Sequence, residues 1–232
     1  MRTDATSLNR HYADFYADDP RTAWRELGAR EKARSVESLL ERPVGRLVDI
    51  GCGEGSVIAA LAGSLGAAGF LGLEVAPAAL EVARSRTYDA PVEFRVFDGR
   101  KIPSEDGAYD VAILSHVLEH VADPRSLLLE ATRVAGRVVI EVPLELHLRT
   151  RRFRWDDTGH INVFNRRSIR YLVEGCGLNI EAERIYCPGR DVHRFFGGRR
   201  GEAKWAVKAA ALHVGGQAIF TYHYAALAVP GS

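Results

Sequence analysis

The chain has 232 residues, with 31 Lys plus Arg, 30 Asp plus Glu and a formal net charge of +1. Hydrophobic residues make up 47% of it and charged residues 26%, an ordinary globular composition that excludes a collagen-like or broadly disordered chain. The length favours one domain. The near-neutral charge argues against a protein whose whole surface grips nucleic acid.

Cysteine usage and the absence of long apolar runs indicate the compartment. Cys52, Cys176 and Cys187 lie far apart and have no C-x-x-C spacing, so neither a disulfide framework nor a cysteine-rich zinc site is expected. Residues 1–15 are polar and lack the apolar core of a signal peptide. No apolar run approaches the ~20 residues of a membrane span. We therefore expect a cytoplasmic protein without membrane contact.

Residues 1–43 predict a helical arm or lid that belongs to the same domain as the rest of the chain. Apolar residues recur among charges over 26–41, which predicts an amphipathic helix ended by a proline. The aromatic residues Tyr12, Tyr16 and Trp24 precede or begin this helix. They form either a lid over a ligand or a staple that holds the helix to the core, and the staple is favoured.

Residues 44–143 alternate between short apolar runs and helical patterns. The predicted strands cover 46–50, 70–74, 92–97, 109–114 and 136–142. The predicted helices cover 57–65, 77–86 and the segment after Pro124. This alternation indicates right-handed βαβ crossovers and a parallel sheet covered on both faces. The connection 98–108 has little helical patterning and is predicted to be a loop.

The pattern changes after Pro143. The sequence predicts an irregular Arg-rich segment, a helix over 169–176, and β-rich runs over 179–186 and 217–229. Between the two runs it predicts a Gly/Arg loop and then a helix over 202–213. No linker divides the chain, so residues 44–232 are predicted to form one domain together with the N-terminal arm.

A glycine-rich turn joins the first predicted strand to its helix. Its glycines, Gly51, Gly53 and Gly55, have the spacing G-x-G-x-G, which permits a tight turn and close approach of a ligand to the backbone. A dinucleotide fingerprint needs G-x-G-x-x-G, but Ser56 occupies the last glycine position. The acid before the turn, Asp49, suits a positively charged ligand better than a pyrophosphate.

At this turn the chain resembles the class I S-adenosylmethionine-dependent methyltransferases. The motifs that carry the resemblance are Val48-Asp49-Ile50-Gly51-Cys52-Gly53-Glu54-Gly55, Gly72-Leu73-Glu74, Phe97-Asp98-Gly99 and the run over 109–121. Residues 44–143 are covered well, and 144–186 more loosely through the segment Gly159-His160-Ile161-Asn162-Val163-Phe164. Four such motifs in order at strand ends are specific, although each alone is weak.

The resemblance implies a Rossmann-like, doubly wound α/β fold with a seven-stranded, mostly parallel sheet, an antiparallel last strand and helices on both faces. It also implies S-adenosylmethionine as the cofactor and a small-molecule acceptor. Ligands on such sheets bind outside the carboxyl ends of the strands. The residues expected to bind the donor are Asp49, Gly51, Cys52, Gly53, Gly55, Glu74, Val75, Asp98, Gly99, Ser115 and His116.

Several of these residues have expected roles. Glu74 can accept hydrogen bonds from the ribose hydroxyls, Asp98 can reach the adenine amino group, and Val75 can pack on the adenine face. Ser115 and His116 end the fourth strand nearest the sulfonium. For the two acids the alternative is an ordinary helix cap or a solvated carboxylate, but the glycine turn favours the binding roles.

The segment His116-Val-Leu-Glu119-His120 has the H-x-x-E-H pattern of zinc peptidases. Two histidines four residues apart on a helix could share a metal ion. The alternative is that the segment simply follows the fourth methyltransferase strand, where similar sequences occur and the family does not use them for metal. The βαβ order is wrong for a peptidase, so no metal site is expected.

His160 and His116 are the candidate catalytic residues. His160 lies between Trp155 and Phe164, beside the expected mouth of the active site, where an imidazole could take a proton from a hydroxyl. The alternative is a structural histidine bonded to backbone. His116 is the second candidate base, because the end of the fourth strand more often contacts the donor.

The expected function is methyl transfer to a small molecule, as O-methylation, with N-methylation as the other outcome. Arginines crowd residues 149–170 and 190–200, which indicates either a surface for an anionic acceptor or solvated faces, and solvated faces are favoured. Alternatives are an RNA methyltransferase and a non-catalytic S-adenosylmethionine-binding module. Nucleic acid is disfavoured, because no N/D-P-P-Y/F-type motif follows the fourth strand and no RNA-binding module is evident.

Overall fold

The computed structural model of the chain describes residues 22–41, 44–148, 150 and 159–231. Tyr12, Tyr16 and Trp155, which the sequence analysis singles out, lie outside the described residues. The same is true of part of the Arg-rich segment between residues 149 and 158.

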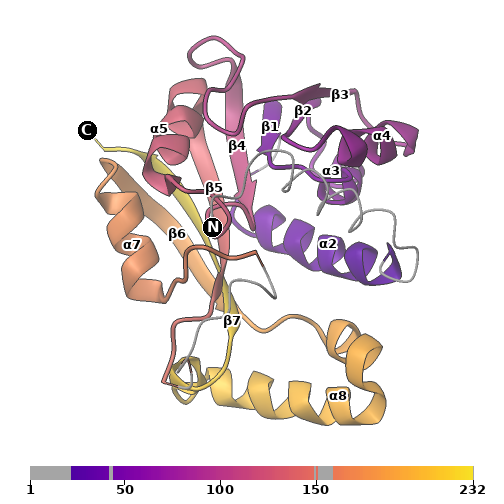
Figure 1. The fold of residues 1–232 in the computed structure, drawn as a ribbon, viewed down its shortest axis with the longest axis vertical. Helices are drawn as coiled ribbons and strands as arrows, with labels where there is room; N and C mark the ends of the chain where they lie inside the picture. The colour runs from indigo at the N-terminus through magenta and orange to yellow at the C-terminus, as the bar shows by residue number, and fades with distance from the viewer. Residues whose placement is uncertain (1–21, 42–43, 149, 151–158, 232) are drawn as a thin grey trace.

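One seven-stranded sheet forms the centre of the described fold (Figure 1). In spatial order its strands are β3 (Val92–Val96), β2 (Gly69–Glu74), β1 (Arg46–Ile50), β4 (Tyr109–Ser115), β5 (Ala135–Leu144), β7 (Tyr222–Pro230) and β6 (Leu178–Tyr186). Strands β3, β2, β1, β4 and β5 are parallel, and β7 pairs antiparallel with both β5 and β6. The predicted sheet and its antiparallel last strand are confirmed, although a 3-10 turn, η2 (Gly216–Ala218), precedes β7 where strand was expected.

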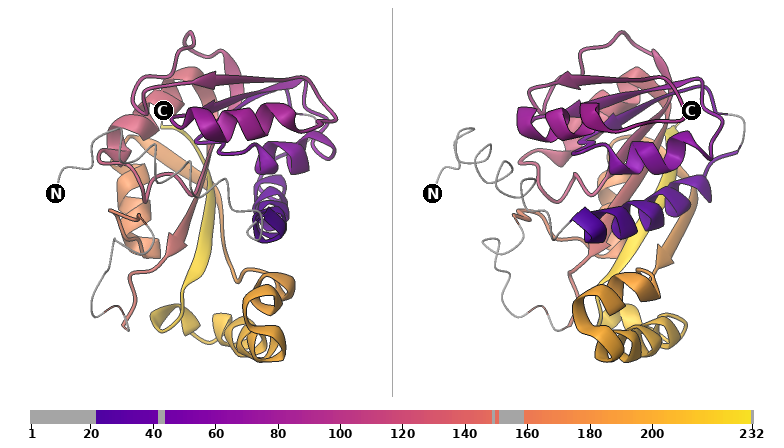
Figure 2. Two further views of the ribbon diagram at one scale, coloured as in Figure 1. Left: turned by 45° about the vertical axis from the view of Figure 1, so that its right-hand side comes forward. Right: turned by 90° about the vertical axis from the view of Figure 1, so that its right-hand side faces the viewer.

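Helices cover both faces of this sheet, as predicted (Figure 2). On one face α5 (Pro124–Val134) and α7 (Arg166–Glu174) bury residues such as Leu128 and Ile169. On the other face α2 (Thr22–Glu37), α3 (Ser56–Ala62) and α4 (Pro77–Ser85) bury Val36, Ile58 and Leu80. Among the described residues, no helix is both long enough and apolar enough to cross a membrane.

The segment between β6 and β7 differs from the prediction. Instead of a Gly/Arg loop followed by a helix, α8 (Arg190–Leu212) is helical from its first residue and is interrupted only at Gly198, where φ is 53°. Glycine accepts this left-handed conformation without steric cost, so the glycines bend the helix rather than ending it. Trp24 of α2 lies edge-on to Phe196 of α8, with 5.6 Å between the ring centroids. Phe196 is exposed, so this contact joins two helices and does not test whether Trp24 holds α2 to the core.

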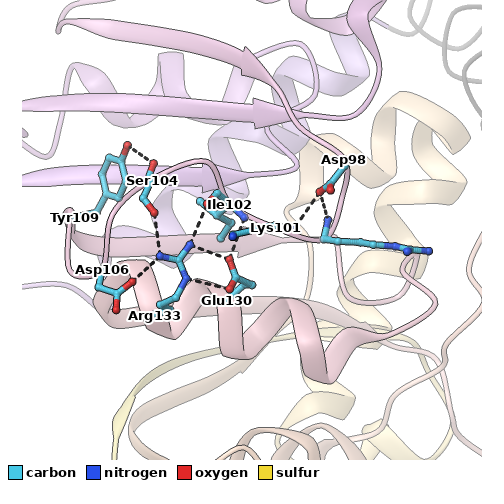
Figure 3. Close-up of polar contacts among 9 residues, drawn as sticks. Asp98, Lys101, Ile102, Ser104, Asp106, Tyr109, Glu130 and Arg133 are labelled. Carbon is cyan, nitrogen blue, oxygen red and sulfur yellow. Dashed lines mark hydrogen bonds and ion pairs between the residues drawn. The ribbon is translucent and has the colours of Figure 1, made fainter.

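The connection between β3 and β4 is a loop, as predicted, and one arginine holds it against α5 (Figure 3). The Arg133 guanidinium donates hydrogen bonds to the carbonyl oxygens of Ile102 and Ser104, at 2.9 Å each. It also forms ion pairs with the carboxylates of Asp106 and Glu130. These contacts fix the loop that carries Asp98 at its start.

Replacing Arg133 should therefore loosen this loop. In Arg133→Ala two loop carbonyls lose a side-chain hydrogen bond, and Asp106 and Glu130 lose an ion pair, so we expect the free energy of unfolding to fall by ~1–3 kcal/mol. Urea denaturation followed by circular dichroism measures the change. Arg100→Ala, at an exposed position of the same loop, should change stability by less than ~0.5 kcal/mol. Equal stability of the two variants would contradict the role given to Arg133.

Candidate active site

The predicted donor-binding residues meet along the carboxyl edge of the parallel strands. In the sheet register, Asp49 of β1 is opposite Gly72 of β2 and Ile113 of β4. β1 therefore has neighbours on both sides whose chains continue into loops at the same edge. Connections leave β1 and β4 toward opposite faces of the sheet, which is the position where open α/β sheets bind ligands.

The glycine turn after β1 needs glycine at each of its three positions. Gly51, Gly53 and Gly55 have φ angles of 79°, 54° and 74°, in the region that other residues rarely adopt. A Cβ atom on Gly51 would lie 2.6 Å from a methyl group of Val117, in the segment after β4. The backbone of the turn therefore lies directly against the loop that follows β4, and the two candidate motifs are neighbours in space.

Glu74, the last residue of β2, joins the end of this strand to the glycine turn. One carboxylate oxygen accepts from the Gly53 N–H at 3.0 Å, and the other accepts from the N–H groups of Val75 at 2.7 Å and Ala76 at 3.0 Å. Burial raises the pKa of Glu74, and the three backbone donors oppose that shift. A carboxylate has about four acceptor positions, so three bonds leave one for a ligand.

Asp49 lies on the face of the sheet covered by α2. Its side chain is buried, and burial raises its pKa to about 7, with Glu74 and Glu141 adding to the shift and Lys32 of α2 opposing it. The neighbouring Cys52 is also buried, and burial raises the pKa of its thiol. The acid of the first motif is thus poised between its neutral and charged forms near pH 7, and a nearby positive charge would favour the charged form.

The loop after β3 closes the site on the side of β2. A Cβ atom on Gly99 would lie 3.2 Å from a methyl group of Val75, so the two predicted residues are neighbours. Asp98 is exposed, and its Oδ1 accepts from the N–H groups of Lys101 and Arg100 at 2.8 Å each, which lowers its pKa. Figure 3 shows this carboxylate at the start of the loop, where it accepts from loop backbone. No helix follows it, so of the two alternatives to adenine binding the structure fits the exposed carboxylate and not the helix cap.

Ser115, at the end of β4, belongs to a buried polar network. Its hydroxyl donates to the carboxylate of Glu141 on β5 at 2.5 Å, and the Tyr186 hydroxyl donates to the same carboxylate. Glu141 is fully buried, and burial raises its pKa against the opposing charge of Lys32 and these hydrogen bonds. His223 of β7 follows, with Nδ1 3.3 Å from the Tyr186 hydroxyl. The network fixes Ser115, so its side chain has a structural task as well as any contact with a ligand.

His116 has a strained backbone and a mostly buried ring. Its φ of 58° is the only positive value at a non-glycine residue in the described part of the chain. The ring lies edge-on to His223, with 4.6 Å between centroids, and Nδ1 is 3.1 Å from Glu119. Burial first, and then the charges of Lys32 and nearby histidines, lower the pKa of His116 well below its ordinary value.

The H-x-x-E-H segment forms a turn after β4. The zinc-peptidase interpretation of this pattern requires a helix, which the segment does not form. The segment 159–162 is hydrogen-bonded to this turn. The N–H groups of Ile161 and Asn162 donate to the Glu119 carbonyl at 2.8 and 3.0 Å. The Asn162 side chain donates to the carbonyls of Leu118 and Val121. These bonds bring His160 beside the residues that follow β4, although the two segments lie about 40 positions apart in the sequence.

The carboxylate of Glu145 holds His160. Its Nδ1 is 2.6 Å from an oxygen of Glu145, the residue that follows β5. Burial alone would lower the pKa of His160, but the hydrogen bond and charge of Glu145, with a contribution from Glu119, outweigh it and raise the pKa. The adjacent His120 ring lies edge-on at 4.7 Å, and burial lowers its pKa.

Sequence reasoning missed the residues that support this site. Glu145 and Lys32 carried no motif, and the clamping role of Asn162 is visible only in three dimensions. Glu54, inside the glycine turn, is buried and forms ion pairs with Arg25 of α2 at 3.0 Å and Arg86 at 2.9 Å. Arg25 and Arg86 are distant from Glu54 in sequence. The sequence therefore indicates these ion pairs only through the presence of a charged residue between two glycines.

Several residues of the two Arg-rich segments form ion pairs at the surface. Arg166 and Arg170 contact Glu183, and Arg190 and Arg194 contact Glu202. These pairs agree with the solvated-face interpretation that the sequence favoured for the described arginines.

Comparison with known proteins agrees with this geometry. A family model described as a methyltransferase domain matches residues 23–183. An uncharacterized 37.1 kDa protein from a Streptomyces fradiae transposon is 37% identical over 128 residues, which are 51% of this chain and 37% of that protein. Chloroplastic tocopherol O-methyltransferase of Arabidopsis thaliana is 28% identical over 144 residues, 54% of this chain and 41% of that protein. The matched region thus spans less than half the length of either relative.

Solved structures share the fold at lower sequence identity. The [4+2]-cyclase SpnF superposes with a TM-score of 0.66 at 19% identity, covering 92% of this chain and 85% of that one. A geranyl diphosphate methyltransferase in complex with SAM gives a TM-score of 0.65 at 17% identity, covering 86% and 84%. Since the family model matches residues 23–183, well over half of the chain, and a solved methyltransferase shares the fold, the chain belongs to the class I S-adenosylmethionine-dependent methyltransferases.

Proposed function

We propose that this protein transfers the methyl group of S-adenosylmethionine to a hydroxyl group of a small-molecule acceptor. The observation that carries the proposal is the position of His160, held by Glu145 and fixed against the turn after β4, next to the glycine turn. Family membership supports methyl transfer, and the tocopherol O-methyltransferase relative supports oxygen as the acceptor atom.

The residues at the strand ends fit this donor. S-adenosylmethionine supplies a methyl group on a positively charged sulfur. The open acceptor position of Glu74 suits a ribose hydroxyl, and the glycine turn permits close approach of the ligand. Asp49 offers a carboxylate whose charged form a cationic ligand would favour. Asp98 and Val75 are proposed to contact the adenine, and Ser115 and His116 the methionine end.

A hydroxyl acceptor needs help to lose its proton, and His160 is the group proposed to give it. Because Nδ1 donates to the Glu145 carboxylate, Nε2 is the nitrogen that can accept a proton. Glu145 would then stabilise the imidazolium that forms, as a carboxylate does behind a histidine base. His116 ranks second, since its buried ring has a strongly lowered pKa and is a weaker base.

Turnover is the direct test of the proposal. The purified chain, given S-adenosylmethionine and a panel of phenolic and aliphatic hydroxyl compounds, should release S-adenosylhomocysteine with at least one acceptor. Donor binding without turnover on hydroxyl, amine or RNA acceptors would instead indicate a non-catalytic binding module. Selective methylation of RNA, with a gel shift, would favour the RNA methyltransferase. The SpnF cyclase shows that the fold alone does not decide among these outcomes.

The proposed role of Glu74 in donor binding can be tested by substitution. In Glu74→Ala, the affinity for S-adenosylhomocysteine should fall by ~10- to 100-fold, because a hydrogen bond to a charged group contributes ~1.5–3 kcal/mol. The affinity is measured by calorimetry. Glu81→Ala, at an exposed position on α4, should bind normally. Normal affinity in a folded Glu74→Ala protein would show that β2 does not hold the ribose.

The acceptor site makes the second prediction. In His160→Ala, kcat should fall by ~10²- to 10⁴-fold, the range typical of a general base, while the affinity for S-adenosylhomocysteine stays unchanged. With a phenolic acceptor the loss should shrink at high pH, where the hydroxyl ionises unaided. If His116→Ala loses turnover and His160→Ala keeps it, with donor binding intact in both, the base is His116.

The contact between His160 and Glu145 makes a third prediction. Glu145 raises the pKa of His160 in the folded protein above its ordinary ~6.5. The contact therefore stabilises the fold fully below pH ~6.5, and this stabilisation is lost as the pH rises through the folded-state pKa of His160. Glu145→Gln should therefore lower the free energy of unfolding more at pH ~5.5 than at pH ~8.5, and NMR titration should show a lower pKa for His160.

The matched control for this third prediction is Glu105→Gln, at an exposed position in the loop before β4. It should leave both the stability profile and the His160 titration unchanged. A His160 titration that is identical in Glu145→Gln and the wild type would contradict the assigned contact.

A further inference from the structure

A carboxylate and two imidazoles converge beside the acceptor side of the site. One ligand atom from each of Glu119, His120 and His160 lies within 4.8 Å of the other two. Glu119 and His120 belong to the turn after β4, and the hydrogen-bonded segment 159–162 supplies His160. Three ligand-type atoms at this separation can surround one metal ion after small side-chain movements.

Glu119 is the unusual member of this group. Its side chain is fully buried. Oε1 lies 3.1 Å from His116 Nδ1, and no contact of Oε2 with another side chain is recorded among the described residues. A buried carboxylate without hydrogen bonds is costly and is normally paired or bound to a metal ion. Glu119 therefore has one buried oxygen, Oε2, that a cation could bind while Oε1 keeps its contact with His116.

Both histidines have a hydrogen-bonded Nδ1, the kind of support that metal-binding histidines have on their other ring nitrogen. His120 Nδ1 lies 3.1 Å from the carbonyl oxygen of Gly159, which can only accept, so Nδ1 is the protonated nitrogen. His160 Nδ1 donates to the Glu145 carboxylate at 2.6 Å. In both rings Nε2 is left as the nitrogen with the lone pair. Metal-ligating histidines almost always donate their other N–H to a carbonyl or a carboxylate in this way.

We propose that Glu119, His120 and His160 bind a first-row divalent transition-metal cation such as Zn²⁺. Two imidazoles and one carboxylate suit Zn²⁺, Fe²⁺ or Mn²⁺ better than Mg²⁺ or Ca²⁺, which prefer oxygen ligands. The sequence analysis expected no metal, because similar segments of the resembled family do not bind metal and the βαβ order is wrong for a zinc peptidase. In the structure the pattern is a turn, and its third ligand comes from the acceptor-side segment.

A second histidine and carboxylate group lies nearby but has different properties. His116, Glu141 and His223 also bring ligand atoms within 4.8 Å of one another. Here the carboxylate already accepts hydrogen bonds from Ser115 and Tyr186. Glu141 therefore has partners without a cation, and the group is a hydrogen-bonded interior network rather than a metal site.

The catalytic role of this cation rests on the proposed function, because the cation would activate the acceptor hydroxyl of that reaction. Three protein ligands leave coordination positions open, as catalytic metal sites do. In the metal-loaded protein a cation would lower the pKa of an acceptor hydroxyl, so that the proton could pass to solvent with His160 as a ligand. The role of His160 as the base, and the titration that tests it, belong to the metal-free protein. The hydroxyl oxygen would then form its bond to the methyl carbon as the bond from sulfur breaks, with no change in the oxidation state of the metal.

Metal binding is tested on the full chain after treatment with a chelator. We expect one equivalent of Zn²⁺ by calorimetry, and one of Co²⁺ by its visible absorption bands, with Zn²⁺ displacing Co²⁺. Glu145→Gln, which alters only the support of His160, should weaken binding by ~10- to 100-fold. His120→Asn, His160→Asn and Glu119→Gln should weaken it more. His213→Asn, at an exposed position after α8, is the matched control and should bind normally.

Either of two results would contradict the proposed metal site. One is that the folded wild type binds neither Co²⁺ nor Zn²⁺ at micromolar concentration. The other is that the His120→Asn/His160→Asn double variant binds metal as well as the wild type does. If Glu119→Gln fails to fold, the histidine variants still decide the outcome. S-adenosylhomocysteine binding is measured on the same samples. Donor binding and turnover without metal binding would refute the site alone, whereas metal binding without donor binding would refute the proposed function and leave the site in place.

Discussion

Glu74 holds two loops of the site together through one carboxylate, and the shape of the donor edge depends on it. Its oxygens accept from Gly53 in the turn after β1 and from Val75 and Ala76 after β2. Backbone N–H groups at strand ends have no partner within the sheet, and a carboxylate can accept several of them at once. The same acid therefore satisfies the turn and retains an acceptor position that a ligand can use.

The face of the sheet beneath this edge buries several acids, and α2 is what makes that arrangement tolerable. Asp49 and Glu141 both lie under α2, where the charge of Lys32 opposes the rise in their pKa that burial causes. Glu54 is paired there with Arg25 from the same helix. A buried acid without such neighbours would be costly. α2 is therefore part of the electrostatic environment of the site as well as a cover for the apolar core.

The sequence predicts the parallel half of the fold well, because alternating strands and helices with glycine turns leave few alternatives. It fails at α8, where Gly198 bends a helix that the pattern interprets as a loop. It also predicts which acids lie at or near the strand ends, Asp49, Glu74 and Asp98, and their contact with the methyl donor stays a prediction. It does not find Glu145 or the clamp of Asn162, because their partners are set by tertiary contacts between distant segments.

In the turn after β4, the backbone conformation decides which side chains His116, Glu119 and His120 can contact. On a helix, His116 and His120 would lie on one face, with Glu119 beside them. In the turn, His116 points toward His223 in the interior, while His120 contacts the ring of His160. The segment 159–162 then places an imidazole from another part of the chain where the helix would have placed His116. The buried carboxylate of Glu119 is near both groups, because Oε1 lies 3.1 Å from His116 Nδ1 and a carboxylate oxygen lies within 4.8 Å of His120 and His160.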